Sequence, residues 1–276
     1  MSGEARFLAV DLGAESGRVF LGRFDGGRVS LEELHRFPNM PVRVADGLHW
    51  DVLRLFGETE RGLGRAAGRG VRSVGVDAWG VDFALLDREG ALVSNPYHYR
   101  DARTAGMMEE AGRRVPKEEI YRITGIQFIP LNTLYQLLAM EGSPLLEASD
   151  RLLMIPDLFA YWLCGERLCE HTAATTTQLY AAGGGWARAL IRRMGLPERL
   201  FGEVVRPGTR LGGLLPGVRE DTGLGEAEVV AVATHDTASA VAAVPARGRD
   251  FAYISSGTWS LVGVETERPV ISEEGL

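Results

Sequence analysis

The sequence predicts an α/β protein in which helices flank a mixed sheet. Three early runs, residues 6–12, 19–24 and 29–37, are apolar and rich in β-forming residues, and the third alternates apolar with polar positions. Runs of this kind joined by short turns are typical of antiparallel strands in one sheet. Helix-like and strand-like segments then follow one another along the chain, which favours a layered α/β arrangement.

The later elements can be assigned in chain order. Residues 50–67 have helical spacing, with Asp51 as an acid at the start and Gly68 and Gly70 as stop signals. The other expected helices are 131–140, 152–163, 186–194 and one that begins at 238; the expected strands are 71–76, 81–86 and 229–234, with a hairpin formed by 252–254 and 260–264.

Composition excludes several classes of protein. The 276 residues suffice for one large domain or two smaller ones, and the net charge of −7 argues against binding to a nucleic-acid backbone. No apolar run approaches the roughly 20 residues that span a bilayer, and the first residues lack the layout of a signal peptide. Cys164 and Cys169 cannot form a disulfide framework and have no paired histidine for zinc. We therefore expect a cytoplasmic protein whose partner is a small molecule, not a nucleic acid or a membrane.

The first candidate site is residues 11–18 (DLGAESGR), between the first two strands. Its two glycines allow a sharp turn and a close approach of the backbone to a ligand, and consecutive N–H groups in such a turn can surround a phosphate. Ser16 adds a hydroxyl, Arg18 adds a planar cation, and Asp11 could hold magnesium through water. The alternative is an ordinary hairpin with a glycine turn. The segment is neither a Walker loop nor a dinucleotide fingerprint.

A second candidate site is residues 77–83 (DAWGVDF), where two acids and a tryptophan surround Gly80 at the end of a strand. Gly80 would let a sugar lie against the backbone, and Trp79 could pack on an apolar edge of that sugar. The alternative is a strand–turn–strand with a buried tryptophan.

Two further motifs lie near the end of the chain. Asp236 follows a predicted strand in residues 234–238 (THDTA) and is well placed to act as a general base beside the N–H groups of the next helix. The alternative makes Asp236 or Thr237 merely a helix N-cap. In residues 255–260 (SSGTWS), small hydroxyl residues around a glycine suit nucleotide phosphates, although an ordinary polar turn would look the same. The first and last hairpins are alike. Two related halves of a protein that face a cleft would produce this pattern.

In this order, the four motifs resemble those of the FGGY carbohydrate kinases, which belong to the actin–hexokinase superfamily. WGVDF, HDTASAV and SSGTWSL, together with residues 124–137 and 174–179, are similar to the rhamnulokinase branch of that family. The resemblance runs from about residue 7 to the end and implies ribonuclease-H-like (actin-like ATPase) domains that close over ATP. Residues 1–246 would form the N-terminal domain, with the sugar side and the first phosphate loop. Residues 247–276 would begin the nucleotide-side domain with its first hairpin.

The resemblance also implies a reaction, the ATP-dependent and Mg²⁺-dependent phosphorylation of L-rhamnulose at its 1-hydroxyl. Asp236 matches the catalytic base, and the hypothesis that Asp11 holds Mg²⁺ through water is kept. The residues matched to sugar binding are Gly80, His235, Asp236 and Thr237, and those matched to ATP binding are Ala14, Glu15, Ser16, Gly17, Arg18 and Thr258.

Members of the family are usually far longer than this chain. We therefore expect a C-terminal truncation that impairs activity and allows self-association through the unfinished second domain. Two alternatives stay open: a kinase for another ketose, such as fuculose or xylulose, and a catalytically inactive sugar-binding remnant. Asp101 and Arg103 are weaker candidates for the wall of the sugar pocket.

Overall fold

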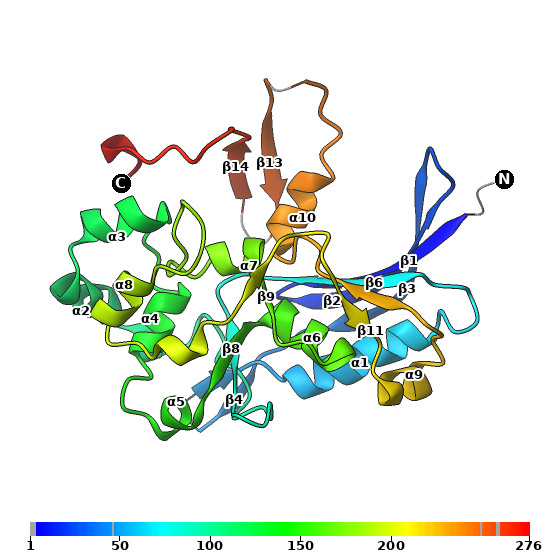
Figure 1. Cartoon of the computed structure of the whole chain (residues 1–276), viewed down its shortest axis with the longest axis horizontal. Helices are drawn as coiled ribbons and strands as arrows, with labels where there is room; N and C mark the ends of the chain where they lie inside the picture. Colours follow the sequence, from blue (N-terminus) through cyan, green and yellow to red (C-terminus); the bar gives the residue numbers. More distant parts are fainter. Residues whose placement is uncertain (1–3, 46, 249, 258–259) are drawn as a thin grey trace.

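The computed structural model describes residues 4–45, 47–248, 250–257 and 260–276, and its centre is a six-stranded sheet (Figure 1). The first three strands form the antiparallel arrangement that the sequence predicts. β6 runs parallel to β1, and β12 runs parallel to β6. The carboxyl ends of β1, β6 and β12 therefore meet at one edge of the sheet. In spatial order the strands are β11 (Arg210–Gly213), β12 (Glu228–Val230), β6 (Ser73–Ala78), β1 (Ala5–Leu12), β2 (Ser16–Phe24) and β3 (Val29–Pro38).

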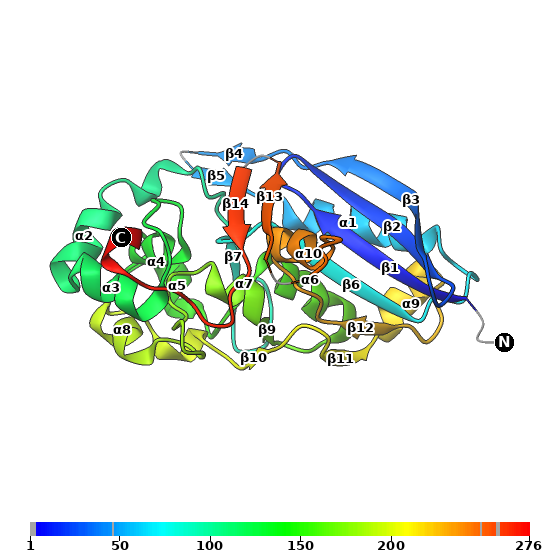
Figure 2. The same ribbon diagram turned by 90° about the horizontal axis from the view of Figure 1, so that it is seen from above.

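Helices cover both faces of this sheet. α1 (Val52–Gly64), α6 (Ile155–Cys164) and α9 (Pro216–Thr222) pack on one face, and α10 (Asp236–Ala242) lies on the other (Figures 1 and 2). α1 begins as predicted, because the Asp51 side chain accepts a hydrogen bond from the Arg54 N–H at 3.3 Å. Its apolar face, with Leu55 and Leu63 fully buried, packs against β2 and β3.

A second, mostly helical part lies beside the six-stranded sheet, at the left in Figure 2. It has an apolar core of its own, in which Leu134, Leu137 and Ile191 are fully buried. This part comprises α2 (Met107–Arg114), α3 (Lys117–Thr124), α4 (Thr133–Leu138), α5 (Pro144–Ala148) and α8 (Arg188–Arg193), beside the antiparallel pair β7 (Phe83–Leu86) and β8 (Arg151–Met154).

Short elements complete the described chain. The antiparallel pair β13 (Ala252–Ser256) and β14 (Ser260–Val264) confirms the predicted last hairpin, which stands beside α10 on the upper side of the sheet (Figure 1). None of the helices within the described ranges is both long and apolar enough to cross a membrane. The other elements are β4 (Val42–Val44), β5 (Gly47–His49), β9 (Cys169–Glu170), α7 (His171–Thr175), β10 (Val204–Val205) and 3₁₀ turns at Ala102–Thr104, Glu198–Leu200 and Glu273–Gly275.

The structure corrects several predicted boundaries. The helix predicted at 152–163 is wrong in its first turn, because residues 151–154 form β8 and pair with β7. That apolar run is buried on both faces, and periodicity alone does not separate a buried strand from a buried helix. The helix predicted at 50–67 ends at Gly64. The strand predicted at 229–234 is regular only over Glu228–Val230.

The buried face of α1 gives a test of this packing. Leu55→Ala should lower the free energy of unfolding by about 2–5 kcal/mol, because it removes a fully buried side chain and leaves a cavity. Leu53 lies on the same helix and is 62% exposed, so Leu53→Ala is the control and should change stability by less than about 0.5 kcal/mol. Urea unfolding at constant m-value measures both. Equal effects of the two variants would contradict the assigned helix face.

Candidate functional site

A pocket of about 590 Å³ lies at the sheet edge where β1, β6 and β12 end. All four sequence motifs contribute to its wall, together with the segment before α4. Backbone hydrogen bonds join the strand ends there, from the Trp79 N–H to the Leu12 carbonyl (3.2 Å) and from the Ala78 N–H to the Thr234 carbonyl (2.9 Å). The lining residues are Asp11, Gly13, Ala14, Arg18, Trp79, Gly80, Val81, Tyr99, Ile126, Ile129, Leu131, Asn132, Thr176, His235, Asp236, Thr237, Ser255, Ser256, Gly257 and Leu261.

The turn between β1 and β2 is tight and braced from outside. The Gly13 N–H donates to the Ser16 carbonyl at 3.0 Å, which closes the turn. Asn39, at the end of β3, donates through its side chain to the Gly13 carbonyl (2.8 Å) and through its N–H to the Glu15 carbonyl (2.9 Å). This brace was missed in the sequence, because Asn39 lies 26 residues from Gly13.

Only part of the predicted phosphate loop lines the pocket. Ala14 and Arg18 do so, whereas Glu15, Ser16 and Gly17 do not. Gly17 has a packing reason to lack a side chain, since a Cβ there would lie 2.2 Å from the ring of Phe37. Thr258, the remaining predicted ATP contact, lies outside the described residues.

Three carboxyl groups lie near one another at the pocket: Asp11 and Asp236 line it, whereas the buried Asp77 does not. Asp11 and Asp77 are partners across β1 and β6, and Asp236 begins α10. Burial raises the pKa of Asp77 to about 8, with the Asp11 carboxylate adding to the rise, so Asp77 holds a proton at neutral pH. Burial also raises the pKa of Asp11, and Arg18 opposes that rise from 3.3 Å.

These residues fit a magnesium ion only if the substrate phosphates supply part of its coordination. No group of three or more His, Cys, Asp or Glu side chains in the described part of the chain is arranged to hold a metal ion. Mg²⁺ usually keeps several waters and binds one or two carboxylates together with substrate phosphates. Asp11 borders the pocket and could supply one such contact.

Asp236 does not act as a helix N-cap. The cap position of α10 is His235, and Asp236 is the first helical residue. Its Oδ1 accepts from the N–H (2.5 Å) and the hydroxyl (3.2 Å) of Thr237, the very next residue, whereas a capping side chain bonds two or three residues ahead. The capping alternative is therefore wrong, and the carboxylate borders the pocket.

His235 lies beside Asp236, with its Nε2 3.4 Å from Asp236 Oδ1. Burial lowers the pKa of His235, and the carboxylates of Asp236 and Glu170 oppose this only in part. The imidazole is therefore neutral at pH 7 and can exchange hydrogen bonds with a neutral ligand.

Gly80 and Val81 form a wall that hydrogen bonds hold in place. A Cβ at Gly80 would lie 2.9 Å from Thr176 and 3.2 Å from the His235 ring, so this position requires glycine. Val81 has φ +66°, a left-handed conformation that is strained for a β-branched residue. Its N–H donates to Thr176 Oγ1 (3.0 Å), and its carbonyl accepts from Thr133 Oγ1 (2.6 Å).

The DAWGVDF candidate site includes two acids, but neither of them lines the pocket, and Asp82 lies behind this wall. Its side chain is fully buried. Oδ2 accepts from Trp50 Nε1 (2.5 Å), Trp79 Nε1 (3.0 Å) and the Tyr99 N–H (3.1 Å), and Oδ1 accepts from Gln136 Nε2 (2.7 Å). Two of these donors, Trp79 and Tyr99, line the pocket, so Asp82 fixes their orientation.

Asp101 and Arg103 also lie behind the wall, so the interpretation of these two as pocket-lining residues is wrong. Asp101 accepts from the Leu48 N–H at 2.7 Å, and Arg103 donates to the carbonyl and side chain of Gln136. Both therefore support the network around Asp82.

Comparison with known proteins gives one family. The N-terminal domain of the FGGY family of carbohydrate kinases matches residues 7–243. A rhamnulokinase of Bacteroides thetaiotaomicron is 47% identical over 97% of this chain and 56% of its own length. A rhamnulokinase of Pectobacterium atrosepticum is 44% identical over 98% and 55%. The chain thus spans about half the length of the curated relatives it matches.

Solved structures agree on the fold. A gluconate kinase from Lactobacillus acidophilus superposes with a TM-score of 0.87 at 14% identity, covering 99% of this chain and 56% of that one. A carbohydrate kinase from Novosphingobium aromaticivorans gives 0.84 at 24%, covering 99% and 58%. Together with the mixed, helix-flanked sheet, these matches confirm the predicted actin-like fold class.

The buried Asp82 predicts a pH dependence of stability. Burial raises its pKa in the folded state from 3.8 to about 6, so the folded state binds this proton more tightly than the unfolded state. The contribution of Asp82 to the free energy of unfolding is therefore largest below pH 4. It falls by about 3 kcal/mol in total as the pH rises through 6, and it becomes constant above about pH 7. The measurement is urea unfolding of the unmodified chain and of Asp82→Asn between pH 4 and 7.

In the difference between the unfolding free energies of the unmodified chain and Asp82→Asn, the titration of the other carboxyl groups cancels. Asparagine would also face Gln136 with an unfavourable donor, but this cost does not vary with pH. The difference in unfolding free energy between the two proteins should therefore shift in favour of the variant as the pH rises. A difference that stays constant across this range would contradict the role of Asp82.

Proposed function

The chain belongs to the FGGY family of carbohydrate kinases, and we propose that it supplies the sugar side of an ATP-dependent kinase that phosphorylates L-rhamnulose at the 1-hydroxyl. The observation that carries the proposal is the single pocket in which the DLGAESGR, DAWGVDF, THDTA and SSGTWS motifs meet. The curated relatives at 42–47% identity carry the name rhamnulokinase, which supports this sugar.

Asp236 is the proposed catalytic base. Its carboxylate borders the pocket. Among the described residues its hydrogen bonds go to the adjacent Thr237, with His235 Nε2 at 3.4 Å, and in this proposal it accepts a proton from a sugar hydroxyl. As that oxygen forms its bond to the γ-phosphorus, the bond from this phosphorus to the β–γ bridging oxygen breaks and ADP leaves. The proton passes to Asp236. Positioning and charge neutralisation supply most of the catalysis in such a transfer.

The sugar would lie against Gly80, His235 and Thr237. Gly80 offers backbone without a side chain, and the neutral imidazole of His235 is suited to hydroxyl groups. Another part of the wall is apolar, and it suits the methyl group that distinguishes a 6-deoxyketose such as L-rhamnulose from ketoses without that group. That part is formed by Trp79, Ile126, Ile129 and Leu131.

The nucleotide phosphates would lie at the turn between β1 and β2. We assign this role to Ala14, Glu15, Ser16, Gly17 and Arg18, and we propose Thr258, which lies outside the described residues, as a further ATP contact. Ala14 and Arg18 border the pocket, and Asn39 holds the turn that contains the others. Magnesium, when bound, would neutralise phosphate charge, and Asp11 is placed to contact it through water.

We further propose that residues 1–246 form the sugar-side domain and that residues 247–276 begin the nucleotide-side domain. The N-terminal family domain ends at residue 243, just after α10. The β13–β14 hairpin that follows contacts α10 and brings Ser255, Ser256 and Gly257 to the pocket.

Titration calorimetry tests the proposed substrate. The chain is titrated separately with L-rhamnulose, L-fuculose, D-xylulose and ATP–Mg²⁺, and phosphoryl transfer is followed in a coupled assay. We expect L-rhamnulose to bind most tightly, by about 10- to 200-fold over D-xylulose, which lacks the methyl group. L-Fuculose carries the same methyl group and tests the stereochemistry of the hydroxyl contacts instead. Absence of sugar binding would overturn the proposal, whereas tighter binding of another ketose would change the substrate within the same family.

Asp236→Asn tests the base. The variant should lower kcat by about 10²- to 10⁴-fold and change sugar affinity little, since the amide keeps the shape but accepts no proton. Asp221→Asn, at an exposed residue of α9 on the opposite face of the sheet, is the control. A near-normal kcat in Asp236→Asn, measured under conditions where the unmodified chain turns over, would remove Asp236 from this role.

A further inference from the structure

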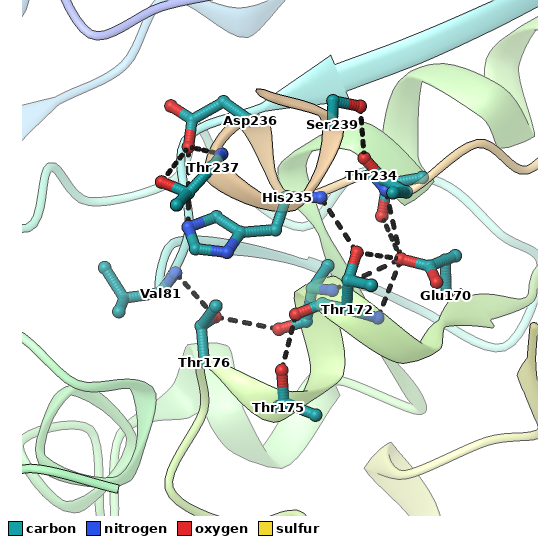
Figure 3. Close-up of polar contacts among 12 residues, drawn as sticks. Val81, Glu170, Thr172, Thr175, Thr176, Thr234, His235, Asp236, Thr237 and Ser239 are labelled. Atoms are coloured by element: carbon teal, nitrogen blue, oxygen red, sulfur yellow. Dashed lines mark hydrogen bonds and ion pairs between the residues drawn. The ribbon is translucent and has the colours of Figure 1, made fainter. Parts of the chain in front are cut away.

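Glu170 is a buried carboxylate, 1% exposed, at the end of β9 and directly before α7. Its Oε2 accepts hydrogen bonds from two segments, one directly after Glu170 and one 64 residues further along the chain. From α7 it receives the Thr172 N–H (2.8 Å), the Thr172 hydroxyl (2.5 Å) and the Ala173 N–H (3.3 Å). From the segment after β12 it receives the N–H (3.1 Å) and the hydroxyl (2.8 Å) of Thr234 (Figure 3).

The hydrogen bonds around Glu170 also hold His235, the residue after Thr234. Thr172 Oγ1, which donates to Glu170, accepts the His235 N–H at 3.1 Å. The two residues immediately before Asp236 are therefore both fixed to α7, one directly by Glu170 and the other through Thr172 (Figure 3). Hydrogen bonds to a carboxylate in a buried site are among the stronger ones in proteins.

Capping of α7 explains only part of this arrangement. Glu170 does occupy the N-cap position of α7, which accounts for its bonds to Thr172 and Ala173. A cap has no need of Thr234, whose N–H and hydroxyl both converge on the same oxygen. Sequence reasoning gave no signal here, because glutamate is not among the preferred capping residues.

We propose that Glu170 is a positioning residue for the proposed kinase reaction, fixing Thr234 and His235 so that the Asp236 carboxylate faces the sugar. The inference rests on the proposed function, and it adds a residue that does not itself line the pocket. All five of these donors use the same oxygen, Oε2, whereas Oε1 has no hydrogen-bond partner among the described residues. The geometry therefore depends on one acceptor atom.

Two substitutions at Glu170 test whether the acceptor oxygen is what matters, because one keeps such an oxygen and the other removes it. In Glu170→Gln the amide oxygen can take the place of Oε2 and the amide nitrogen the place of the unpartnered Oε1. Glu170→Met fills the same space without an acceptor. We expect Glu170→Gln to bind L-rhamnulose within about threefold of the unmodified chain and Glu170→Met to lose at least about tenfold, since several buried donors lose their partner.

Hydrogen–deuterium exchange, read by mass spectrometry on segments 171–177 and 231–240, gives a measure that does not need a ligand. Glu170→Met should speed exchange in both segments, and Glu170→Gln should restore both. If Glu170→Met exchanges fast throughout because it does not fold, Thr234→Val and Thr234→Ser provide the test. Valine removes the hydroxyl and should speed exchange in 231–240, whereas serine keeps it and should not.

Thr175→Val is the matched control, because Thr175 Oγ1 donates to the Thr172 carbonyl within α7 and contacts neither Glu170 nor His235 (Figure 3). It should leave sugar affinity and exchange in 231–240 unchanged. The inference is overturned if Glu170→Met speeds exchange only in 171–177 and binds L-rhamnulose normally. If the unmodified chain binds no sugar but the exchange pattern holds, the positioning by Glu170 stands and the proposed substrate fails.

Discussion

The site depends on one constraint, the joining of three parallel strand ends by backbone hydrogen bonds. Leu12 and Ala78 end β1 and β6, and Thr234 follows shortly after β12. The Trp79 N–H donates to the Leu12 carbonyl, and the Ala78 N–H donates to the Thr234 carbonyl. Each strand is followed at once by a polar motif. Because the ladder of the sheet sets the register of all three strands, it also sets the distances between the motifs, and loops that are far apart in the sequence form one pocket.

Two buried carboxylates fix the positions of residues around the pocket. Asp82 holds Trp79 and Tyr99, and Glu170 holds Thr234 and, through Thr172, His235. Burying a carboxylate is costly unless several donors surround it, and a fully partnered network then defines one arrangement of its neighbours. The apolar core supports the sheet, whereas these polar centres determine which side chains face the ligand.

The local part of the structure could be predicted from the sequence, and the long-range part could not. Strand periodicity gave β1, β2, β3 and the last hairpin, and turn chemistry gave the loop after Asp11. The strand at 151–154 was taken for helix, because only its pairing with β7 distinguishes the two. Asp82 and Gly17 were interpreted as site residues, yet their surroundings come from Trp50, Gln136 and Phe37, which no local pattern connects to them.

The left-handed backbone of Val81 has a consequence for engineering. Valine is strained at this φ, whereas glycine and asparagine tolerate it, so the fold gives up some stability to keep a branched side chain on the pocket wall. We expect directed evolution for heat resistance alone to replace Val81 early, and the resulting proteins to hold a wider and less selective cavity. A screen that includes ligand recognition at each round would retain the valine.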